Sequence, residues 1–491
     1  MLERWVTHPV TRLLRGLALA TTILAPFAAA HAAPVLLATG TLTGSSAGAG
    51  VDLSGLTAAL ENGVPGNALG GIGSGLAWAG GSTFIAVPDR GPNAVTYNAA
   101  LDNTSSYVAR LETVNLALTP GVGGAQGTLT PTLTATTLLW SGTPLNYGTG
   151  AGLGNRIDGT TPVGAGAPAI NGNGRYYFTG RSDGFGPGNS GNPDNARLDP
   201  EGVRVSRDGR SVFVSDEYGP YVYQFDRATG QRIRSYTLPG NLSVATLSPV
   251  GKSEEAPANI SGRVDNKGME GLAITPDGKT LVGAMQQALL QDQAAQPKLL
   301  RFVTIDVATG ATKEYAYLLT AGTGVSEIVA LNDHEFLVDE RDGKGLGDGT
   351  AAKVKQLFRI DITGATDITG LSANAAAAVA VPKSAAVVDL VALLGANGVS
   401  ATNVPAKIEG LAFGDDTTLL VGGVPTTLHT LYVANDNDFV PNVSGPNLYY
   451  AIGLTDADLG AVFQQQAVPE PGTMALLGAG LLGLLGRRRR G

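Results

Sequence analysis

A pattern of two short apolar strands around a tight turn recurs five times along the chain. In each copy a small or acidic residue opens the first strand, and polar or charged residues close the second. Turns such as Asp208-Gly209 and Asp277-Gly278 predict antiparallel hairpins. Strand repeats of this size predict a β-propeller whose blades each begin with one hairpin. The copies span residues 74–90, 201–217, 270–286, 327–341 and 409–438.

The number of blades is inferred from the spacing of the copies. The first interval, from Gly75 to Glu201, is much longer than the others and predicts one further blade that includes residues 175–178. We therefore expect an all-β protein that folds as a six-bladed propeller. The apolar runs 35–38 and 448–452 are expected to close the ring by pairing the terminal strands.

Composition agrees with a fold rich in turns. Gly supplies 69 of the 491 residues without a collagen-like triplet period, which favours many tight turns between short strands. One stretch differs, because residues 374–381 are rich in Ala and are followed by a largely apolar run at 384–395. We expect this Ala-rich region to be an insertion that carries one short helix.

Residue types that are absent or rare exclude several functions. The chain has no Cys, which excludes disulfides, thiolate zinc sites and a cysteine nucleophile. It has four His, of which His8 and His31 lie near the N-terminus, so a multi-His metal centre is not expected. The net charge is −8, and the two ends carry seven basic but only two acidic residues, so the region between them is more acidic still. Such a domain does not suit nucleic acid and favours cations.

The N-terminus has the features of a secretory signal peptide over residues 1–32. Three Arg precede an apolar run from Leu17 to Ala30, and Ala30-His31-Ala32 gives the small-x-small cleavage pattern. The alternative is an N-terminal membrane anchor, for which the run is short, because a spanning helix needs about 20 apolar residues.

The C-terminus, residues 461–491, is expected to be a linker and a sorting segment after a domain at 33–460. It contains Val468-Pro469-Glu470-Pro471-Gly472, an apolar run at 473–486 and four Arg. This order resembles the PEP-CTERM sorting signal of Gram-negative bacteria. The resemblance implies processing by an exosortase, transient membrane anchoring through the C-terminal helix, and release to the cell envelope or extracellular matrix. The alternative is a short tail anchor.

Four of the five copies open with a glutamate. The first strand of each propeller blade lines the central channel, so these side chains are expected to converge on one axis. Like charges that are brought together repel unless a cation offsets them, and Ca²⁺ prefers oxygen ligands. A ring of metal ligands is therefore predicted, and the alternative is that each Glu bonds nearby backbone amides and seals the channel. The ring consists of Glu201, Glu270, Glu327 and Glu409.

The ends of the second strands supply another set of polar residues. Short loops gather at one face of a propeller, so we expect these residues to add cation ligands or to bind a polar ligand. The alternative is a set of solvated loop tips. The further metal candidates are Asp89, Asp216, Glu217, Asp339, Glu340 and Asp436, while Met285 and Gln286 take the corresponding places in the third copy.

Several motifs carry a family resemblance from about residue 71 to 454. They are Asn-Lys-Gly-Met-Glu-Gly-Leu at 266–272, Val-Ser-Glu-Ile at 325–328, Lys-Ile-Glu-Gly-Leu at 407–411 and Asn-Asp-Asn-Asp-Phe at 435–439. The chain resembles the phytase-like domain family, described as having esterase-like activity of phytase. The resemblance implies a β-propeller and, by similarity to Ca²⁺-dependent alkaline phytases, phosphoester hydrolysis.

The resemblance also suggests roles for individual residues. The four Glu of the ring would act catalytically through bound metal, and Arg90, Lys267 and Arg341 would neutralise phosphate. Asn437 is a further candidate for substrate binding. Gln286 stands where the resemblance leads us to expect an acidic residue, and no Asp-Asp-Pro motif appears near the start of the domain.

Two other functions fit the same sequence. One is a non-catalytic surface propeller, stabilised by Ca²⁺, that binds the exopolysaccharide matrix. The other is a lactonase-type propeller that uses one channel metal and no phosphate contacts. Fold alone does not decide among these functions.

Overall fold

The computed structural model describes nine stretches of the chain, all within one folded unit. The expected signal peptide at 1–32 lies outside the described residues, as do the apolar run and the four Arg of the sorting segment. The described residues are 33–42, 50–92, 104–122, 125–150, 154–181, 188–248, 254, 257–421 and 423–469.

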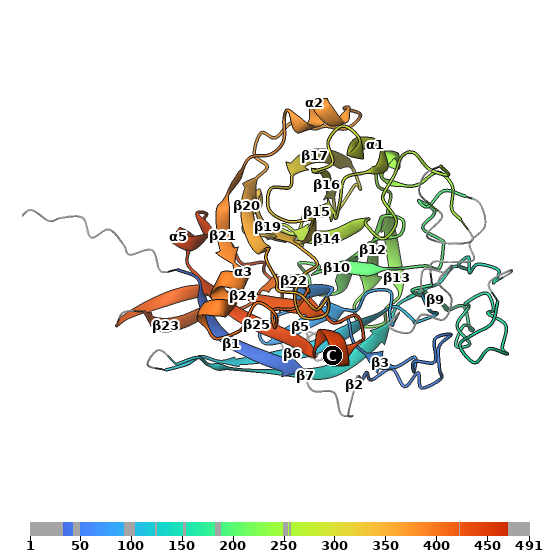
Figure 1. Cartoon of the computed structure of the whole chain (residues 1–491), viewed down its shortest axis with the longest axis horizontal. Coiled ribbons are helices and arrows are strands. Elements are labelled where there is room, and N and C mark those ends of the chain that lie inside the picture. The colour runs from blue at the N-terminus through green and yellow to red at the C-terminus, as the bar shows by residue number, and fades with distance from the viewer. Residues whose placement is uncertain are drawn as a thin grey trace, which may run out of the picture. The chain divides into compact units, whose positions relative to one another are not determined.

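Five antiparallel sheets are arranged around one axis (Figure 1). Blade 1 contains β4 (Gly75–Trp78), β5 (Thr83–Val87), β6 (Arg110–Thr119) and β7 (Thr128–Leu138). Blade 2 contains β10 (Pro200–Val205), β11 (Ser211–Asp216), β12 (Tyr221–Asp226) and β13 (Arg232–Tyr236). Blade 3 contains β14 (Met269–Ile274), β15 (Thr280–Met285), β16 (Leu299–Asp306) and β17 (Thr312–Leu318). Blade 4 contains β18 (Gly324–Ala330), β19 (Glu335–Arg341), β20 (Lys355–Asp361) and β21 (Lys383–Asp389). Blade 5 contains β22 (Lys407–Phe413), β24 (Val424–Asp436), β25 (Asn447–Leu454) and β1 (Val35–Leu42), and β23 (Thr417–Val421) pairs with β24.

The first strand of each blade lines a central channel. The inner strands β4, β10, β14, β18 and β22 contact one another in this order, and β22 contacts β4 to complete the ring. We call the end of the channel where the inner strands begin the upper mouth, and the end where they finish the lower mouth.

The expectation of six blades is wrong, because the propeller has five. Residues 175–178 contribute only β9 (Tyr176–Tyr177), which pairs with β8 (Trp140–Ser141) in a two-stranded sheet. The long first interval has two other causes. The outer strands β6 and β7 are 10 and 11 residues long, and the chain between β9 and β10 adds no blade strand among its described residues.

The predicted closure of the ring by the terminal strands is confirmed. β1 is the outermost strand of blade 5 and pairs antiparallel with β25, with Val35 opposite Gly453 and Leu42 opposite Asn447. The first and last strands of the propeller are therefore neighbours in one sheet. Another small sheet, β2 (Gly50–Val51) with β3 (Ala68–Leu69), lies in the chain between β1 and β4.

Helices are few and short. The Ala-rich stretch forms α2 (Ala373–Ala377), but the following residues form β21, the outer strand of blade 4, before α3 (Leu390–Ala396). Within the described part of the chain, no helix has the length and apolar character needed to cross a membrane. The remaining helices are α1 (Leu290–Gln293), the 3-10 turn η2 (Gly240–Leu242), α4 (Pro441–Ser444) and α5 (Asp456–Leu459).

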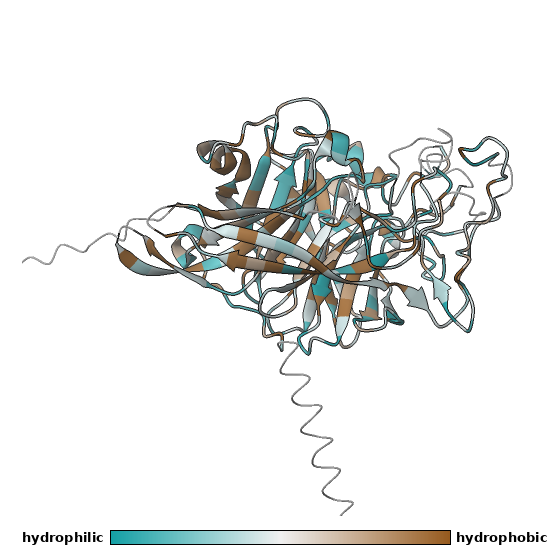
Figure 2. Cartoon of the chain, turned by 90° about the horizontal axis from the view of Figure 1, so that it is seen from below, coloured by the Kyte–Doolittle hydropathy of each residue, from teal (hydrophilic) through white to brown (hydrophobic). Residues whose placement is uncertain are grey.

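The core lies between neighbouring blades rather than on one side of each. Strands β10, β11 and β14 are buried along their whole length, because both faces of these strands pack against other parts of the propeller. Hydrophobic positions, brown in Figure 2, recur along the strands. Such packing fixes the inner strands and hence the directions of the side chains at the two mouths.

Candidate functional site

A β-bulge near the start of the inner strand aims polar side chains at the upper mouth in four blades. Pairing with the second strand shifts register between Met269 and Gly271 in blade 3 and between Ile408 and Gly410 in blade 5, which leaves Glu270 and Glu409 without an opposite residue. Bulges of this kind re-aim a side chain, often beside functional sites. By register, the residues that share this position in the five blades are Ser74, Glu201, Glu270, Ser326 and Glu409.

Glu327 lies one residue out of this column, and Ser326 takes its place. The shift in blade 4 falls between Val325 and Glu327, so Glu327 occupies the position that is Gly in the other blades. Its Oε1 accepts hydrogen bonds from the amides of Leu272 and Ile328, both at 2.9 Å. Its Oε2 lies 3.0 Å from Nη2 of Arg204. Burial raises the pKa of Glu327 to about 8, although Arg204 lowers it. The structure therefore places Glu327 with Arg204 rather than in either of the carboxylate clusters described below.

The second strands supply one residue per blade just beyond the bulge. By register these are Asp89, Glu217, Gln286, Arg341 and Asp436.

The other acidic candidates on the second strands come before this position in the chain, and their side chains lie in other surroundings. The carboxylate of Asp216 accepts hydrogen bonds from the amide of Asp199 at 2.8 Å and from the amide of Gly219 at 2.5 Å. Glu340 is fully buried. Its carboxylate accepts hydrogen bonds from the Tyr317 hydroxyl at 2.7 Å, from the Lys383 ammonium and from three loop amides. Asp339 is also fully buried, and neither carboxylate oxygen has a hydrogen-bond partner among the described residues. Its burial raises its pKa to about 7.

A first carboxylate cluster lies at the upper end of blade 2. Asp199, Glu201 and Glu217 are all buried, and one oxygen of each lies within 4.8 Å of the others. Arg90 faces this cluster, since its amide donates to Oδ1 of Asp199 at 2.7 Å and its Nη1 lies 3.1 Å from Oδ2. Burial, and then the charge of Glu270, raise the pKa of both Glu201 and Glu217 well above the usual range.

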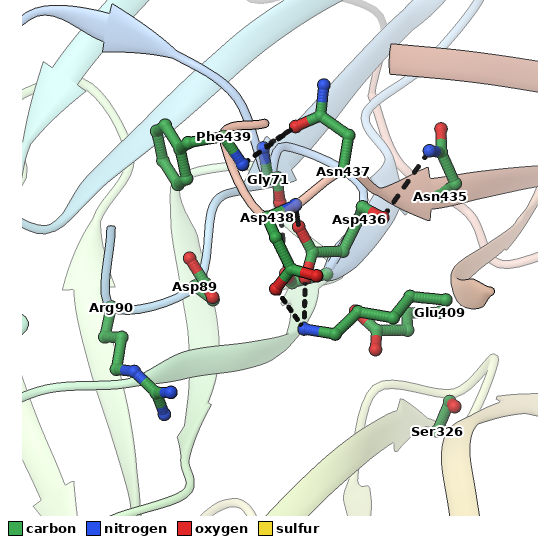
Figure 3. Close-up of polar contacts among 12 residues, drawn as sticks. Gly71, Asp89, Arg90, Ser326, Glu409, Asn435, Asp436, Asn437, Asp438 and Phe439 are labelled. Carbon is green, nitrogen blue, oxygen red and sulfur yellow. Dashed lines mark hydrogen bonds and ion pairs between the residues drawn. The ribbon is translucent and has the colours of Figure 1, made fainter. Parts of the chain in front are cut away.

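A second carboxylate cluster lies where blade 5 meets blade 1 (Figure 3). One oxygen each of Asp89, Asp436 and Asp438 lies within 4.8 Å of the others. Lys407 binds two of them, with Nζ 2.6 Å from Oδ2 of Asp436 and 2.6 Å from Oδ1 of Asp438. Burial raises the pKa of Asp436 to about 7, and burial with the charge of Asp436 raises that of Asp89 well above its usual range.

The backbone around the second cluster is unusual. Asp438 and Phe439 have φ of 52° and 57°, a region that non-glycine residues rarely enter and that often marks functional sites. Gly71 has φ of +60°, and a Cβ there would lie 3.2 Å from Oδ1 of Asp436 and 3.3 Å from Oδ1 of Asp89. Asn437 holds this backbone in place, because its Oδ1 accepts from the amides of Gly71 at 2.9 Å and Phe439 at 3.2 Å.

Glu270 and Arg341 lie between the two clusters. Nε2 of Gln286 donates to Oε1 of Glu270 at 2.6 Å, and Nη2 of Arg341 lies 3.4 Å from the same oxygen. Arg341 also binds Glu409 and the Ser326 hydroxyl. A cavity of about 200 Å³ opens beside these groups, and its lining includes Lys267, Gln286, Ser326 and Arg341.

The donor set fits a hard cation. Oε1 of Glu217 and Oε2 of Glu270 are buried and receive no hydrogen bond from a donor group among the described residues, and the two carboxyl groups lie within hydrogen-bonding reach of each other. Buried carboxylates that lack a donor are costly, and oxygen ligands are those that Ca²⁺ prefers. Burial raises the pKa of Glu270, which agrees with a site that is electrostatically incomplete without a counter-charge.

Sequence reasoning missed three charged residues of the site. Asp199 directly precedes its inner strand, Lys407 opens one, and Asp438 lies in the Asn-Asp-Asn-Asp-Phe motif. Asp438 stood in a quoted motif and could have been found there. Lys407 likewise opened the quoted motif at 407–411, whereas Asp199 gave no signal beyond its nearness to Glu201.

Two family comparisons match this chain. The phytase-like family, described as esterase-like activity of phytase, matches residues 67–439, which include both clusters. The PEP-CTERM protein-sorting motif matches residues 467–490 and implies processing by an exosortase.

The individual proteins that resemble this chain share only a limited part of its sequence. An uncharacterised secreted protein of Arthroderma benhamiae is 30% identical over 328 residues, which are 56% of this chain and 60% of that protein. The chain thus spans less than two thirds of that relative. Among solved structures, the Kuenenia stuttgartiensis hydrazine synthase is 13% identical, with 76% of this chain and 79% of that chain covered and a TM-score of 0.30. The Dos1 propeller is 9% identical, with 83% and 72% covered and a TM-score of 0.28. Scores this low carry no argument about fold or function.

Proposed function

The chain belongs to the phytase-like family, and from this membership and the upper mouth we propose that it is an exported propeller that hydrolyses phosphoesters with bound Ca²⁺. One observation carries the proposal: two buried carboxylate clusters lie at the same mouth of the channel as a cavity lined by Lys267 and Arg341. Carboxylate oxygens suit a hard cation, and cationic side chains suit a phosphate.

The cation would be held by the residues of the two clusters. Asp199, Glu201 and Glu217 form the better site, because Oε1 of Glu217 is buried and, within the described part of the chain, receives no hydrogen bond from a donor group. Asp89, Asp436 and Asp438 form the second site, where Lys407 already offsets part of the charge. Bound Ca²⁺ supplies Lewis acidity, which polarises a phosphoryl oxygen and lowers the pKa of a bound water.

The remaining residues of the mouth would bind phosphate and hold a proton. Lys267 and Arg341 line the cavity and would neutralise the phosphate charge, and Arg90 would do so at the first cluster. Glu270, whose pKa burial raises, would hold a proton at Oε2 and pass it to the leaving group. Glu409 would keep Arg341 in place, and Asn437 would keep the Asp436–Asp438 backbone in place.

We also place this activity outside the cell. The sorting motif and the secreted relative indicate an exported protein. We propose that the C-terminal helix anchors it transiently to the membrane of a Gram-negative envelope and that it then acts in the envelope or the exopolysaccharide matrix.

The experiment is a metal analysis of the purified exported form, followed by a panel of phosphoesters, carboxylesters and lactones with and without chelator. Phosphoester turnover that is lost in chelator and restored by Ca²⁺ is the expected result. Turnover of lactones alone would instead indicate a lactonase-type propeller. Bound Ca²⁺ without turnover of any substrate would indicate a matrix-binding protein. Absence of both bound metal and turnover would overturn the proposal.

A further inference from the structure

The segment that follows α5 crosses the lower mouth of the channel. Residues 461–469, which we expected to be a linker, pack against the ends of several inner strands. Gln464, Gln465 and Gln466 line a cavity of about 40 Å³ at this mouth, and Arg204 lines the same cavity from the channel side. The remaining lining includes Trp78, Ile274, Ala330, Ala412 and Phe413.

An aromatic side chain anchors the start of this segment. The ring centroid of Phe463 lies 4.4 Å from that of Phe413 and 4.6 Å from that of His429. The Phe463 amide donates to Oδ1 of Asp456 at 2.8 Å, and Asp456 also binds His429 at 3.2 Å. Two tilted ring contacts and a charge-assisted hydrogen bond hold this end against blade 5.

Contacts with two other blades fix the rest of the segment. The amide of Gln464 donates to the carbonyl of Leu331 at 2.8 Å, at the end of blade 4. Nε2 of Gln466 donates to the carbonyl of Val205 at 2.8 Å, in blade 2. Val468 is only 8% exposed and belongs to the hydrophobic cluster between blades 1 and 2. The segment thus runs from blade 5 across the channel axis to blade 2.

We propose that residues 461–469 are a permanent plug of the lower mouth, and that the exosortase-type enzyme must approach the lower face and remove only residues beyond this plug. The sorting motif overlaps the end of the plug, because its match starts at residue 467 and Val468 is still buried. The exported protein then keeps the plug, and the candidate site stays open at the upper mouth alone. This inference does not depend on the hydrolase proposal.

The test measures how fast engineered thiols react in the folded chain. The chain has no native cysteine, so the single variants Val468→Cys and Val462→Cys report on one position each. Val462 is 66% exposed and is the matched control within the same segment. We expect Val468→Cys to react at least about tenfold more slowly with a maleimide, because it reacts only after local opening. Equal rates would overturn the proposal.

A second pair of variants asks whether Phe463 is the anchor. Phe463→Ala should bring the reaction rate of Val468→Cys close to that of Val462→Cys, whereas Val462→Ala should leave it slow. If Phe463→Ala does not fold, the reaction rates of Val468→Cys and Val462→Cys in the otherwise unchanged chain still decide whether the plug exists. The intact mass of the exported protein gives an independent check. Its C-terminus is expected at or beyond Val468, and an end before Gln464 would contradict a retained plug.

Discussion

Arg204 of blade 2 and Glu327 of blade 4 meet across the channel, with Nη2 3.0 Å from Oε2 and both side chains buried. Blade 3 lies between their strands in the ring, so the pair links two blades that are not neighbours. Arg204 also donates to the carbonyls of Leu76 and Ile328, at 2.6 and 2.7 Å. These contacts close the channel below the candidate site.

This ion pair gives the first prediction. Arg204→Met removes the cation that lowers the pKa of Glu327 and leaves the buried carboxyl group without its partner at Oε2, so the free energy of unfolding should fall by roughly 3 kcal/mol. The double variant Arg204→Met/Glu327→Gln keeps an acceptor for the amides and should be more stable than Arg204→Met alone. Urea unfolding of the wild type, Arg204→Met, Glu327→Gln and the double variant measures the coupling. Additive losses would show that the two side chains do not interact.

A second prediction concerns Ca²⁺ at the first cluster. Glu217→Gln keeps the size of the side chain but removes one of three charges, so it should weaken Ca²⁺ binding. Ca²⁺ at 100 times its Kd should add about 2.7 kcal/mol to the wild-type free energy of unfolding, and clearly less to that of the variant. Thermal melts with Ca²⁺ and with chelator measure this. Asp208→Asn, in a turn at the lower face, is the control and should respond like the wild type. A wild-type melting temperature that chelator leaves unmoved would contradict metal binding.

The crowding at Gly71 gives a third prediction. Gly71→Ala places a methyl group close to Oδ1 of both Asp89 and Asp436, so it should weaken the response of the melting temperature to Ca²⁺. Gly55→Ala is a matched control, because Gly55 has φ of +73° and open space around its Cβ position. Both variants should lose about 1–2 kcal/mol of stability from the strained backbone, and Gly71→Ala should lose more, because its Cβ would also lie 2.9 Å from Cε2 of Phe439. If Gly55→Ala reduced the Ca²⁺ response equally, crowding of the cluster would not be the cause.

The fourth prediction is a pH dependence. Burial raises the pKa of Asp339 to about 7, above its ordinary value of 3.8. The folded state therefore binds a proton that the unfolded state releases between these values, and stability falls as pH rises through this window. Asp339→Asn should reduce that fall by the contribution of one proton and should be more stable than the wild type at pH 8. Urea unfolding at pH 5 and pH 8, in chelator, tests this. An unchanged slope would mean that Asp339 is ionised in the fold throughout.

The hairpins and their convergence on a channel could be predicted from the sequence, because the apolar runs, the Asp-Gly turns and the Glu at the start of the strands repeat together. The blade count could not, since the two outer strands of blade 1 and the stretch after β9 occupy about the length of an extra blade without forming one.

The register of blade 4 could not be predicted from the sequence either. Aligning Glu327 with Glu270 is natural by residue type, but the bulge in blade 4 falls at Ser326. A bulge changes which residue faces the channel without changing the apolar pattern. The glycines that follow the Glu in the other blades were a clue, because Glu327 itself occupies the glycine position in blade 4. These glycines are Gly202, Gly271 and Gly410.

The pairing of β1 with β25 has a consequence for the order in which the protein folds. Val35 and Gly453 are opposite each other in the sheet, yet they leave the export machinery at nearly opposite ends of the process if the chain emerges N-terminus first. All strands of blades 1 to 4 emerge before those of blade 5 are complete. The ring nevertheless stays open, with β1 unpaired, until β25 has emerged. Contacts this distant in sequence form slowly, because the entropy of a very long loop must be overcome first. The carboxylate cluster between blades 5 and 1 is therefore assembled late, after β25 has emerged, and no earlier part of the exported chain carries it in finished form.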